Sequence, residues 1–429
     1  MKIEKQLRKY IMPNVFAMLG TSCYILADTF FISVAQGADG ITALNLILPI
    51  YGLIFAVGAM IGVGAATRYA LQKALDKKDS NLFFSNAIIW DLIVSLIFVG
   101  LGIFCPDLVL KAMGADARIL EIGTIYLRIA LCFAPCFMLN FVFTSFVRND
   151  GSPKTAMAAT LLSSLFNILF DYVLMFPLKL GMTGAALATG LSPILSMAIC
   201  LTHYLSKRNT IKFRMMIPSI RILLDSCKLG IVAFVGELAS GITTLAFNYI
   251  LLGLAGNIAV AAYGVIANLA LVGTAIFNGV SQGLQPLASE AYGRRDNVAQ
   301  ERIYKHSLLI GFILAVILVV IVWFQAENCV KIFNSENSKV MREYGVFGIR
   351  IYFFGFFLAS VNIIRAGFLS ATGCASKSAM IAVMRGIVVI VLFAFLFSRF
   401  FGMTGVWIAY PATEFFTLLV TTRKPKLDK

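Results

Sequence analysis

Two aspartates lie inside long apolar stretches of the 429-residue sequence. Asp28 follows Tyr24 by four residues in CYILADTFFI, and Asp171 follows Asn167 by four residues in NILFDYVLMF. A carboxylate at the middle of a membrane helix costs about 2.5–3.5 kcal/mol on insertion scales, so it needs a partner, a cavity or a function. Two carboxylates near one another either share a proton or hold a cation between them.

Other oxygen-bearing side chains accompany these acids. Ser163, Asn167 and Asp171 recur every four residues, which places them on one face of a helix. Thr189 lies in GAALATGLS, inside the next apolar stretch. Carboxylate, amide and hydroxyl oxygens suit a hard metal ion, and the carboxylates could instead carry protons. The alternative is that each aspartate pairs separately with a buried arginine or with donors at a helix end. We predict a cation site, for Na⁺ or H⁺, at Asp28, Asn167, Asp171 and Thr189.

The composition indicates that the chain carrying these acids is a membrane protein. Hydrophobic residues make up 59% of the chain and charged residues 13%, whereas soluble domains contain about 25% charged residues. The apolar residues form stretches long enough to cross a bilayer as helices, and these stretches are continuously apolar rather than alternating as in a β-barrel. We therefore predict an all-α polytopic membrane protein with twelve transmembrane helices, at residues 11–35, 42–71, 81–105, 119–146, 154–176, 183–205, 219–252, 257–290, 304–325, 343–370, 375–398 and 403–422.

The chain aligns weakly with itself at an offset of about 220 residues. GMTGAALA at 181–188 matches GMTGVWIA at 402–409. Two halves with an even number of spans each have the same orientation and are related by an axis along the membrane normal. We expect two pseudo-symmetric six-helix bundles at 1–205 and 219–429, joined by a linker at 206–218. Such duplicated bundles occur in transporters, but they could also form a channel or a membrane enzyme.

The net charge of +15 is distributed unevenly along the chain. If the N-terminus lies in the cytoplasm, most of the Lys and Arg residues fall in loops on the cytoplasmic side, as the positive-inside rule requires. We therefore expect a multi-pass protein of the plasma membrane with both termini in the cytoplasm. No basic patch with interleaved aromatic residues indicates a nucleic-acid partner.

The aspartates of the predicted cation site have no acidic counterparts in the second half. At the offset of the repeat, Asp28 matches Asn248, and Asp171 matches Leu392 or Phe393. An architectural role would be expected to recur in both halves, whereas a coupling site needs to exist once.

Several other charged residues lie in the predicted helices. Glu237 begins a polar stripe that ends at Asn248. It could face a cavity for a cationic substrate or a second proton, or it could pair with a neighbouring helix, for instance through Arg365. Asp91 and Glu414 lie nearer the inner face, where we expect them to be solvated or locally paired.

Aromatic and methionine side chains could line a substrate cavity. Such side chains adapt to varied apolar cations through cation–π contacts and soft packing. Each of them could equally face lipid or the protein core. The candidates are Met18, Tyr24, Phe31, Tyr51, Met157, Phe247 and Tyr249.

Three stretches carry a resemblance to a known family: ADTFFI at 27–32, GSPK at 151–154 and NILFDYVLMFPLKLGMTGAALAT at 167–189. With them the chain resembles, over essentially its whole length, the multidrug and toxic compound extrusion (MATE) family, and within it the bacterial, MepA-like drug exporters. The resemblance implies a V-shaped pair of six-helix bundles. It further implies export of organic cations and amphipathic drugs by alternating access as Na⁺ or H⁺ enters.

The resemblance also implies roles for particular residues. The family's amino-lobe cation site falls on Asp28, Asn167, Asp171 and Thr189, and its helix-one proline, associated with bending in some members, falls on Pro13.

A helix-seven acid found in some branches falls near Glu237. Branches with a carboxy-lobe cation site carry an aspartate in helix ten, where this chain has Arg365, so the likeness favours the amino-lobe site.

An exporter of this kind is not an enzyme and needs no cofactor besides its coupling ion. It would act on small amphipathic substrates, in contact with membrane lipid, as a monomer. Two rivals stay open. A lipid-linked precursor flippase of the same superfamily would commonly carry a cationic cavity. A polytopic membrane enzyme would need clustered catalytic His or acidic metal-binding pairs in its loops.

Overall fold

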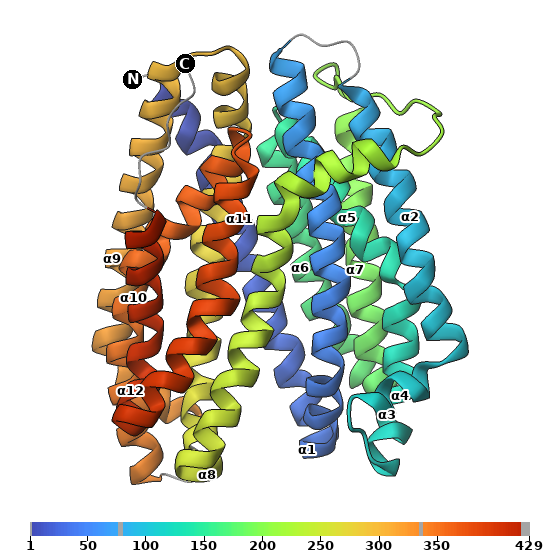
Figure 1. Cartoon of the computed structure of the whole chain (residues 1–429). Coiled ribbons are helices and arrows are strands. Elements are labelled where there is room, and N and C mark those ends of the chain that lie inside the picture. Colours follow the sequence, from blue (N-terminus) through green and yellow to red (C-terminus); the bar gives the residue numbers. More distant parts are fainter. Residues whose placement is uncertain (1, 76–79, 334–337, 422–429) are drawn as a thin grey trace.

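The computed structural model describes residues 2–75, 80–333 and 338–421, and nearly all of them are helical (Figure 1). The helices are α1 (Lys2–Ala74), α2 (Asn81–Phe104), α3 (Pro106–Ala112), α4 (Ala117–Cys132), α5 (Ala134–Asn149), α6 (Pro153–Met175), α7 (Gly181–Tyr204), α8 (Ile220–Gly293), α9 (Asn297–Phe333), α10 (Lys339–Ala371), α11 (Ala375–Val383), the π-helix η1 (Met384–Val388) and α12 (Val389–Thr421).

Three of the long helices are interrupted at glycine. α1 contains a non-helical residue at Gly37 (φ 60°), α8 contains two at Ala255 and Gly256, and α12 contains one at Gly402 (φ 57°). Glycine adopts a positive φ without the steric cost that a Cβ would bring. These breaks lie between adjacent predicted spans, where the chain turns back into the membrane.

The twelve predicted spans all fall on helical segments. By length and composition, ten helical stretches of the described residues can cross a membrane, and α4 with α5, bent by 43°, makes an eleventh. One of the ten, Ala375–Thr421, contains the break at Gly402, so it covers both of the last two predicted spans. The prediction of an all-helical, multi-span membrane protein is therefore confirmed.

The buried apolar residues form one large cluster in each half of the chain. The first cluster runs from Ile32 to Ile211, and the second from Phe247 to Tyr410. A smaller cluster joins the first turns of α1 to α8 and α10, for instance through Ile11 and Val280. We propose from these clusters that the bundles divide near the linker, with the start of α1 packed against the second bundle.

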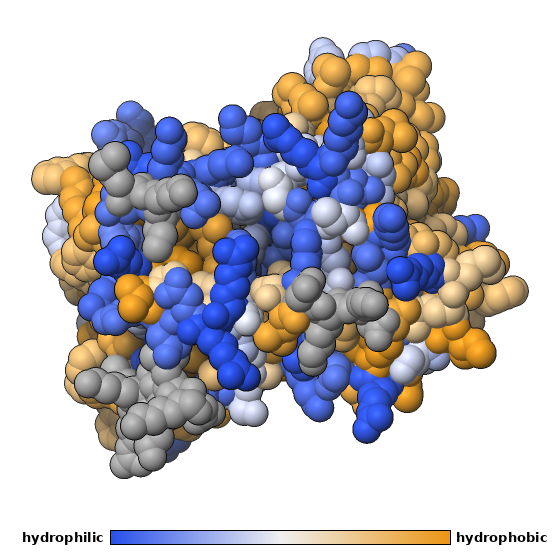
Figure 2. Space-filling model, turned by 90° about the horizontal axis from the view of Figure 1, so that it is seen from above, coloured by the Kyte–Doolittle hydropathy of each residue, from blue (hydrophilic) through white to orange (hydrophobic). Residues whose placement is uncertain are grey.

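We call the upper face in Figure 1, where α1 begins and residues 205–219 connect α7 to α8, the linker face. Hydrophilic side chains cover this face and hydrophobic ones surround it (Figure 2). The halves approach closely on this side of the molecule. A Cβ on Gly283 would lie 2.6 Å from the Cα of Ile11, and one on Gly230 would overlap the carbonyl of Met60. Small residues let membrane helices pack backbone against backbone in this way.

Side chains of α2 hold the linker against the first bundle. They accept hydrogen bonds from backbone N–H groups of the linker at 2.8–3.0 Å, in the pairs Asn81 with Lys212, Ser85 with Arg214 and Asn86 with Ser219.

Asp150, between α5 and α6, forms the centre of this attachment. Its buried carboxylate accepts hydrogen bonds from Lys73 Nζ at 2.7 Å, Tyr69 Oη at 3.0 Å and the backbone N–H of Thr210 at 2.9 Å. His203 Nε2 lies 2.9 Å from its Oδ2. Burial by itself raises the pKa of Asp150, but the hydrogen bonds from Lys73, Thr210 and His203 outweigh it, and the pKa lies below its ordinary value.

We expect the stability contributed by Asp150 to disappear in acid. A carboxylate whose pKa is lower in the folded than in the unfolded protein stabilises the fold fully above the unfolded-state pKa, and this contribution is lost as the pH falls through the folded-state pKa. Asp150→Asn should therefore have a lower Tm than the unsubstituted protein at pH 7. The difference should shrink below about pH 4. A difference in Tm that is independent of pH would contradict this role of the charge.

Gly283→Ala should weaken the contact between the halves. Its Cβ would meet the backbone of α1 near Ile11, which cannot move aside as a flexible side chain can, and overpacking costs about 1–3 kcal/mol. Gly264→Ala in the same helix is the control, because nothing lies within 4 Å of a Cβ there. Thermal unfolding of both variants in detergent tests this. Equal Tm values would mean that the close approach does not contribute to stability.

Candidate cation-binding site

Asn167, Asp171 and Thr189 lie together inside the first bundle. Asn167 and Asp171 are buried on one face of α6, and Thr189 of α7 is buried beside them. In the amide orientation that gives both ends of Asn167 a partner, Nδ2 donates to Asp171 Oδ2 at 3.1 Å. Its Oδ1 then accepts from the hydroxyl and the backbone N–H of Thr189, each at 3.3 Å. Asn167 thereby connects the carboxylate to α7.

The local sequence brings α6 and α7 close enough for this bridge. α6 begins at Pro153, and proline suits the first turn because its missing N–H would have no helical partner there. At the start of α7, a Cβ on Gly184 would lie 2.9 Å from the carbonyl carbon of Leu174. The glycine therefore allows the two helices to approach, and Thr189 follows on the same helix.

Asp28 adds a second carboxylate from α1. It is 9% exposed, and it lies close enough to Asp171 for the two charges to interact. One oxygen of each carboxylate, Oδ1, is buried and makes no hydrogen bond with the described residues. A buried polar atom without a partner is costly, and a shared proton or a bound cation would satisfy both oxygens. The structure thus brings the four predicted site residues together.

The donor set fits Na⁺ or a proton better than a transition metal. Within the described ranges, no group of three or more His, Cys, Asp and Glu side chains could hold a metal ion. Two carboxylates, an amide and a hydroxyl supply oxygen atoms of the kind that hard cations prefer.

Three tyrosines lie around the acids. Tyr24 of α1 is half-buried and lies within electrostatic reach of Asp28, Asp171 and Glu237. The ring of Tyr51, also predicted as a candidate, lies 6.2 Å from that of Tyr126.

Tyr126 of α4 is within electrostatic reach of both Asp28 and Asp171. It is not among the site residues predicted from the sequence. A single tyrosine in an apolar stretch looks the same whether it packs in a core or faces a site, so its spacing carries no signal.

Glu237 lies apart from the four residues, on α8. Its side chain is exposed, and it lies within electrostatic reach of Tyr24 of the other half. The suggested pairing with Arg365 is wrong. Arg365 instead donates to the hydroxyl of Thr421 at 3.4 Å and to its carbonyl, which places it at the end of α12.

The structure separates Glu414 and Asp91 from the cation site. Glu414 is fully buried, and its Oε1 lies 2.5 Å from Arg385 Nη2, which confirms local pairing. Asp91 is fully buried too, but neither of its carboxylate oxygens has a hydrogen-bond partner among the described residues. The expectation that Asp91 is solvated or locally paired is therefore wrong.

The remaining candidates stay predictions. Asn248 and Met157 are half-buried, and Pro13 is buried inside the helical stretch of α1 that precedes the break at Gly37.

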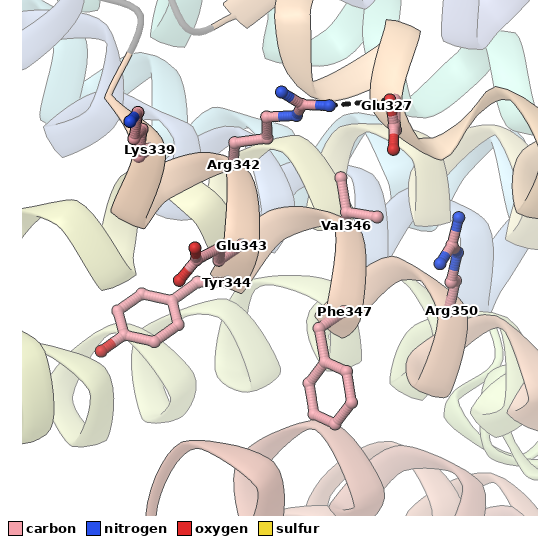
Figure 3. A pocket seen from close by; sticks show the side chains of 8 residues that line it. All are labelled: Glu327, Lys339, Arg342, Glu343, Tyr344, Val346, Phe347 and Arg350. Atoms are coloured by element: carbon pink, nitrogen blue, oxygen red, sulfur yellow. Dashed lines mark hydrogen bonds and ion pairs between the residues drawn. The ribbon is translucent and has the colours of Figure 1, made fainter.

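A cavity of about 630 Å³ lies at the opposite end of the molecule from the linker face, between the end of α9 and the start of α10 (Figure 3). Arg342 and Glu327 pair there at 2.9 Å, and Arg350 contacts the ring of Trp323. None of the predicted cation-site residues lines it. The lining residues are Glu327, Lys339, Arg342, Glu343, Tyr344, Val346, Phe347 and Arg350.

Comparisons with known proteins agree with this architecture. The MatE family model matches residues 13–173 and 233–417. Multidrug export proteins MepA from Staphylococcus saprophyticus and from Staphylococcus aureus strain MRSA252 are each 26% identical over 407 residues, which cover 94% of this chain and 89% of the relative.

Solved structures of the same family share the fold. An outward-facing MATE transporter of the MOP superfamily superimposes with a TM-score of 0.88 at 25% identity, and a MATE protein in complex with MaL6 does so with 0.91 at 24% identity. Each comparison covers 98% of this chain and 94% of the other.

The two kinds of buried acid should respond differently to neutralisation. Asp171→Asn removes a carboxylate that has an oxygen without a donor, so we expect an unchanged or higher Tm. Glu414→Gln leaves Arg385 without its partner and should cost about 3–5 kcal/mol. Thermal unfolding at neutral pH in Na⁺-free buffer compares the two. A larger loss for Asp171→Asn than for Glu414→Gln would identify Asp171 as a structural acid.

Proposed function

Because the chain belongs to the MATE family of membrane transporters, we propose that it exports organic cations and amphipathic drugs in exchange for Na⁺ or H⁺. The family consists of transporters, so the enzyme reading is dropped. The relatives named as multidrug export proteins support the substrate class. The observation that carries the exchange is the pair Asp28 and Asp171, each with a buried oxygen for which the described part of the chain supplies no donor.

The coupling ion would act by neutralising this pair. When both carboxylates are ionised they repel one another, and a bound Na⁺ or a proton removes that repulsion. Asp28 belongs to α1, which also carries Tyr24, within electrostatic reach of Glu237 of the other half. Ion binding would therefore change the free energy of one α1 arrangement relative to another. A ligand shifts such an equilibrium only by its difference in affinity between the two states.

The linker face would be the cytoplasmic face of the membrane. Most of the Lys and Arg residues lie in the segments assigned to this side, in agreement with the positive-inside rule. The glycine contacts at Gly230 and Gly283 would then close the cytoplasmic side in this conformation. The likeness to an outward-facing relative supports this assignment.

A cationic substrate would bind between Tyr24 and Glu237. Tyr24 offers a ring face for a cation–π contact, and Glu237 offers an exposed carboxylate from the other half. A flippase for a lipid-linked pyrophosphate would need basic groups at this place, where the chain has acids. We therefore favour the drug exporter over the flippase.

Neutralising both aspartates should abolish coupled transport without unfolding the protein. In proteoliposomes with an imposed Na⁺ or H⁺ gradient, the unsubstituted protein should drive a cationic dye uphill. The double variant Asp28→Asn/Asp171→Asn should reduce uphill transport to the level of empty liposomes. The gradient that supports transport by the unsubstituted protein identifies the coupling ion.

Glu301→Gln serves as the control, because Glu301 is an exposed acid of α9 that pairs with Lys305 of the same helix at 2.6 Å. It should transport like the unsubstituted protein. Uphill dye transport by the double variant would rule out the proposed coupling site. Downhill ion flux without any substrate would instead indicate a channel.

A further inference from the structure

The second bundle contains a buried ion pair that the proposed exchange does not use. Arg385 lies in η1, and its Nε and Nη2 donate to the two carboxylate oxygens of Glu414 at 3.2 and 2.5 Å. Asn362 Nδ2 donates to Glu414 Oε2 at 2.7 Å and to the Glu414 carbonyl at 2.9 Å. The guanidinium therefore lies side-on against a carboxylate whose remaining bonds come from α10.

Aromatic oxygens complete the surroundings of the guanidinium. Tyr410 lies one turn before Glu414 on α12, and its ring stacks on that of Tyr352 at 4.2 Å and 6°. Both tyrosines are buried and within electrostatic reach of Arg385 and Glu414. A carboxylate, an amide and phenolic oxygens form a set of ligands that suits a monovalent cation as well as it suits a guanidinium.

The internal repeat relates this group to the first bundle. At the offset that matches Asn140 with Asn362, Arg385 corresponds to Ser163, on the face of α6 that carries Asn167 and Asp171. The two bundles thus place polar groups at related positions. In the first bundle Asp28 and Asp171 each keep one oxygen without a donor among the described residues, whereas in the second the Glu414 carboxylate is satisfied by an arginine of the same chain.

We propose that Arg385 is a built-in cation of the second bundle. Its guanidinium occupies a carboxylate site that would otherwise take up an exchangeable monovalent cation, and it thereby confines ion exchange to the first bundle. An arginine stays protonated at every physiological pH and cannot leave the site. The second bundle therefore keeps the same charge throughout the transport cycle. That Arg385 occupies a cation site does not depend on which ion the first bundle binds, whereas the confinement of exchange to that bundle rests on the proposed function.

If the ion pair were purely structural, ions would not reach Glu414 even after Arg385 is truncated. Here the carboxylate of Glu414 is fully buried, while the Arg385 side chain is 15% exposed. A small cation would therefore reach Glu414 from the side on which the Arg385 side chain approaches it. Truncating Arg385 to alanine removes the guanidinium and leaves a space of its size beside Glu414, open on that side.

The test is chemical rescue of Arg385→Ala by guanidinium. We expect millimolar guanidinium chloride to raise the Tm of the purified full-length variant by several degrees, because a ligand that binds the folded state stabilises it. The reference is an equal concentration of choline chloride, and Na⁺ is the second probe. The unsubstituted protein should show no such rise, since its own arginine fills the site.

Arg385→Ala/Glu414→Gln is the matched control, because it lacks the carboxylate that would attract the cation. A rise in Tm for Arg385→Ala that is absent from the double variant supports the proposal. No rise, or an equal rise in both, overturns it.

Recovery of folded protein decides the question if Arg385→Ala proves too unstable to purify. Extraction with guanidinium present should then yield folded Arg385→Ala, whereas the yield of the double variant should not depend on guanidinium. If guanidinium does not increase the yield of Arg385→Ala, the site does not accept an exchangeable cation, and Arg385 is part of a structural ion pair alone.

Discussion

A carboxylate taken out of water must be neutralised or given donors, and the arrangement of this molecule follows from how each of its buried acids meets that requirement. Glu414 receives a guanidinium, and Asp150 receives an ammonium group, a histidine and the backbone N–H of Thr210. Asp28 and Asp171 each keep an oxygen without a donor among the described residues. Acids with complete partners hold the helices together, and the proposed exchange assigns an ion to the incomplete pair Asp28 and Asp171. Asp91 also lacks partners among the described residues, but it lies outside this pair.

Residue spacing and the internal repeat were sufficient to select Asp28 and Asp171, but they did not identify Asp91, whose carboxylate oxygens also lack a hydrogen-bond partner among the described residues. The four-residue spacing of Asn167 and Asp171 predicts a shared helix face, and the structure places both on it. The absence of acids at the matching positions of the second half is the reason for predicting that Asp171 and Asp28 are not architectural acids. These arguments need the helix period and the alignment of the halves, both of which can be read from the chain.

What the sequence could not supply was the rotation of one helix against another. The sequence predicts that Asp91 is solvated or locally paired because it lies nearer the inner face, yet the helices around α2 bury it completely. The sequence suggests Arg365 and Glu237 as a pair, but Arg365 instead bonds to the end of α12. Tyr126 reaches the acids because of how α4 packs. Such contacts depend on tertiary packing, which single-sequence periodicity does not encode.

The turns could be predicted from the sequence, because the positive φ that a turn requires depends on the glycine itself and not on tertiary packing. The repeated GMTG begins with Gly181 in one half and Gly402 in the other, and both have positive φ, 50° and 57°. A glycine therefore occupies the corresponding turn in each half. The boundaries of the predicted spans lie within a few residues of both glycines.

The attachment of the linker to α2 has a consequence for how force would pass between the bundles. Ser219 is hydrogen-bonded to Asn86, and Leu223 and Cys227 pack against the first core. The linker is therefore held against the first bundle at the point where it enters α8. α8 begins against the first bundle and continues through the second, with its close contact to α1 at Gly230. A tilt of one half relative to the other would therefore have to bend α8 near Gly230, and would be limited by the stiffness of this helix rather than by the length of the linker.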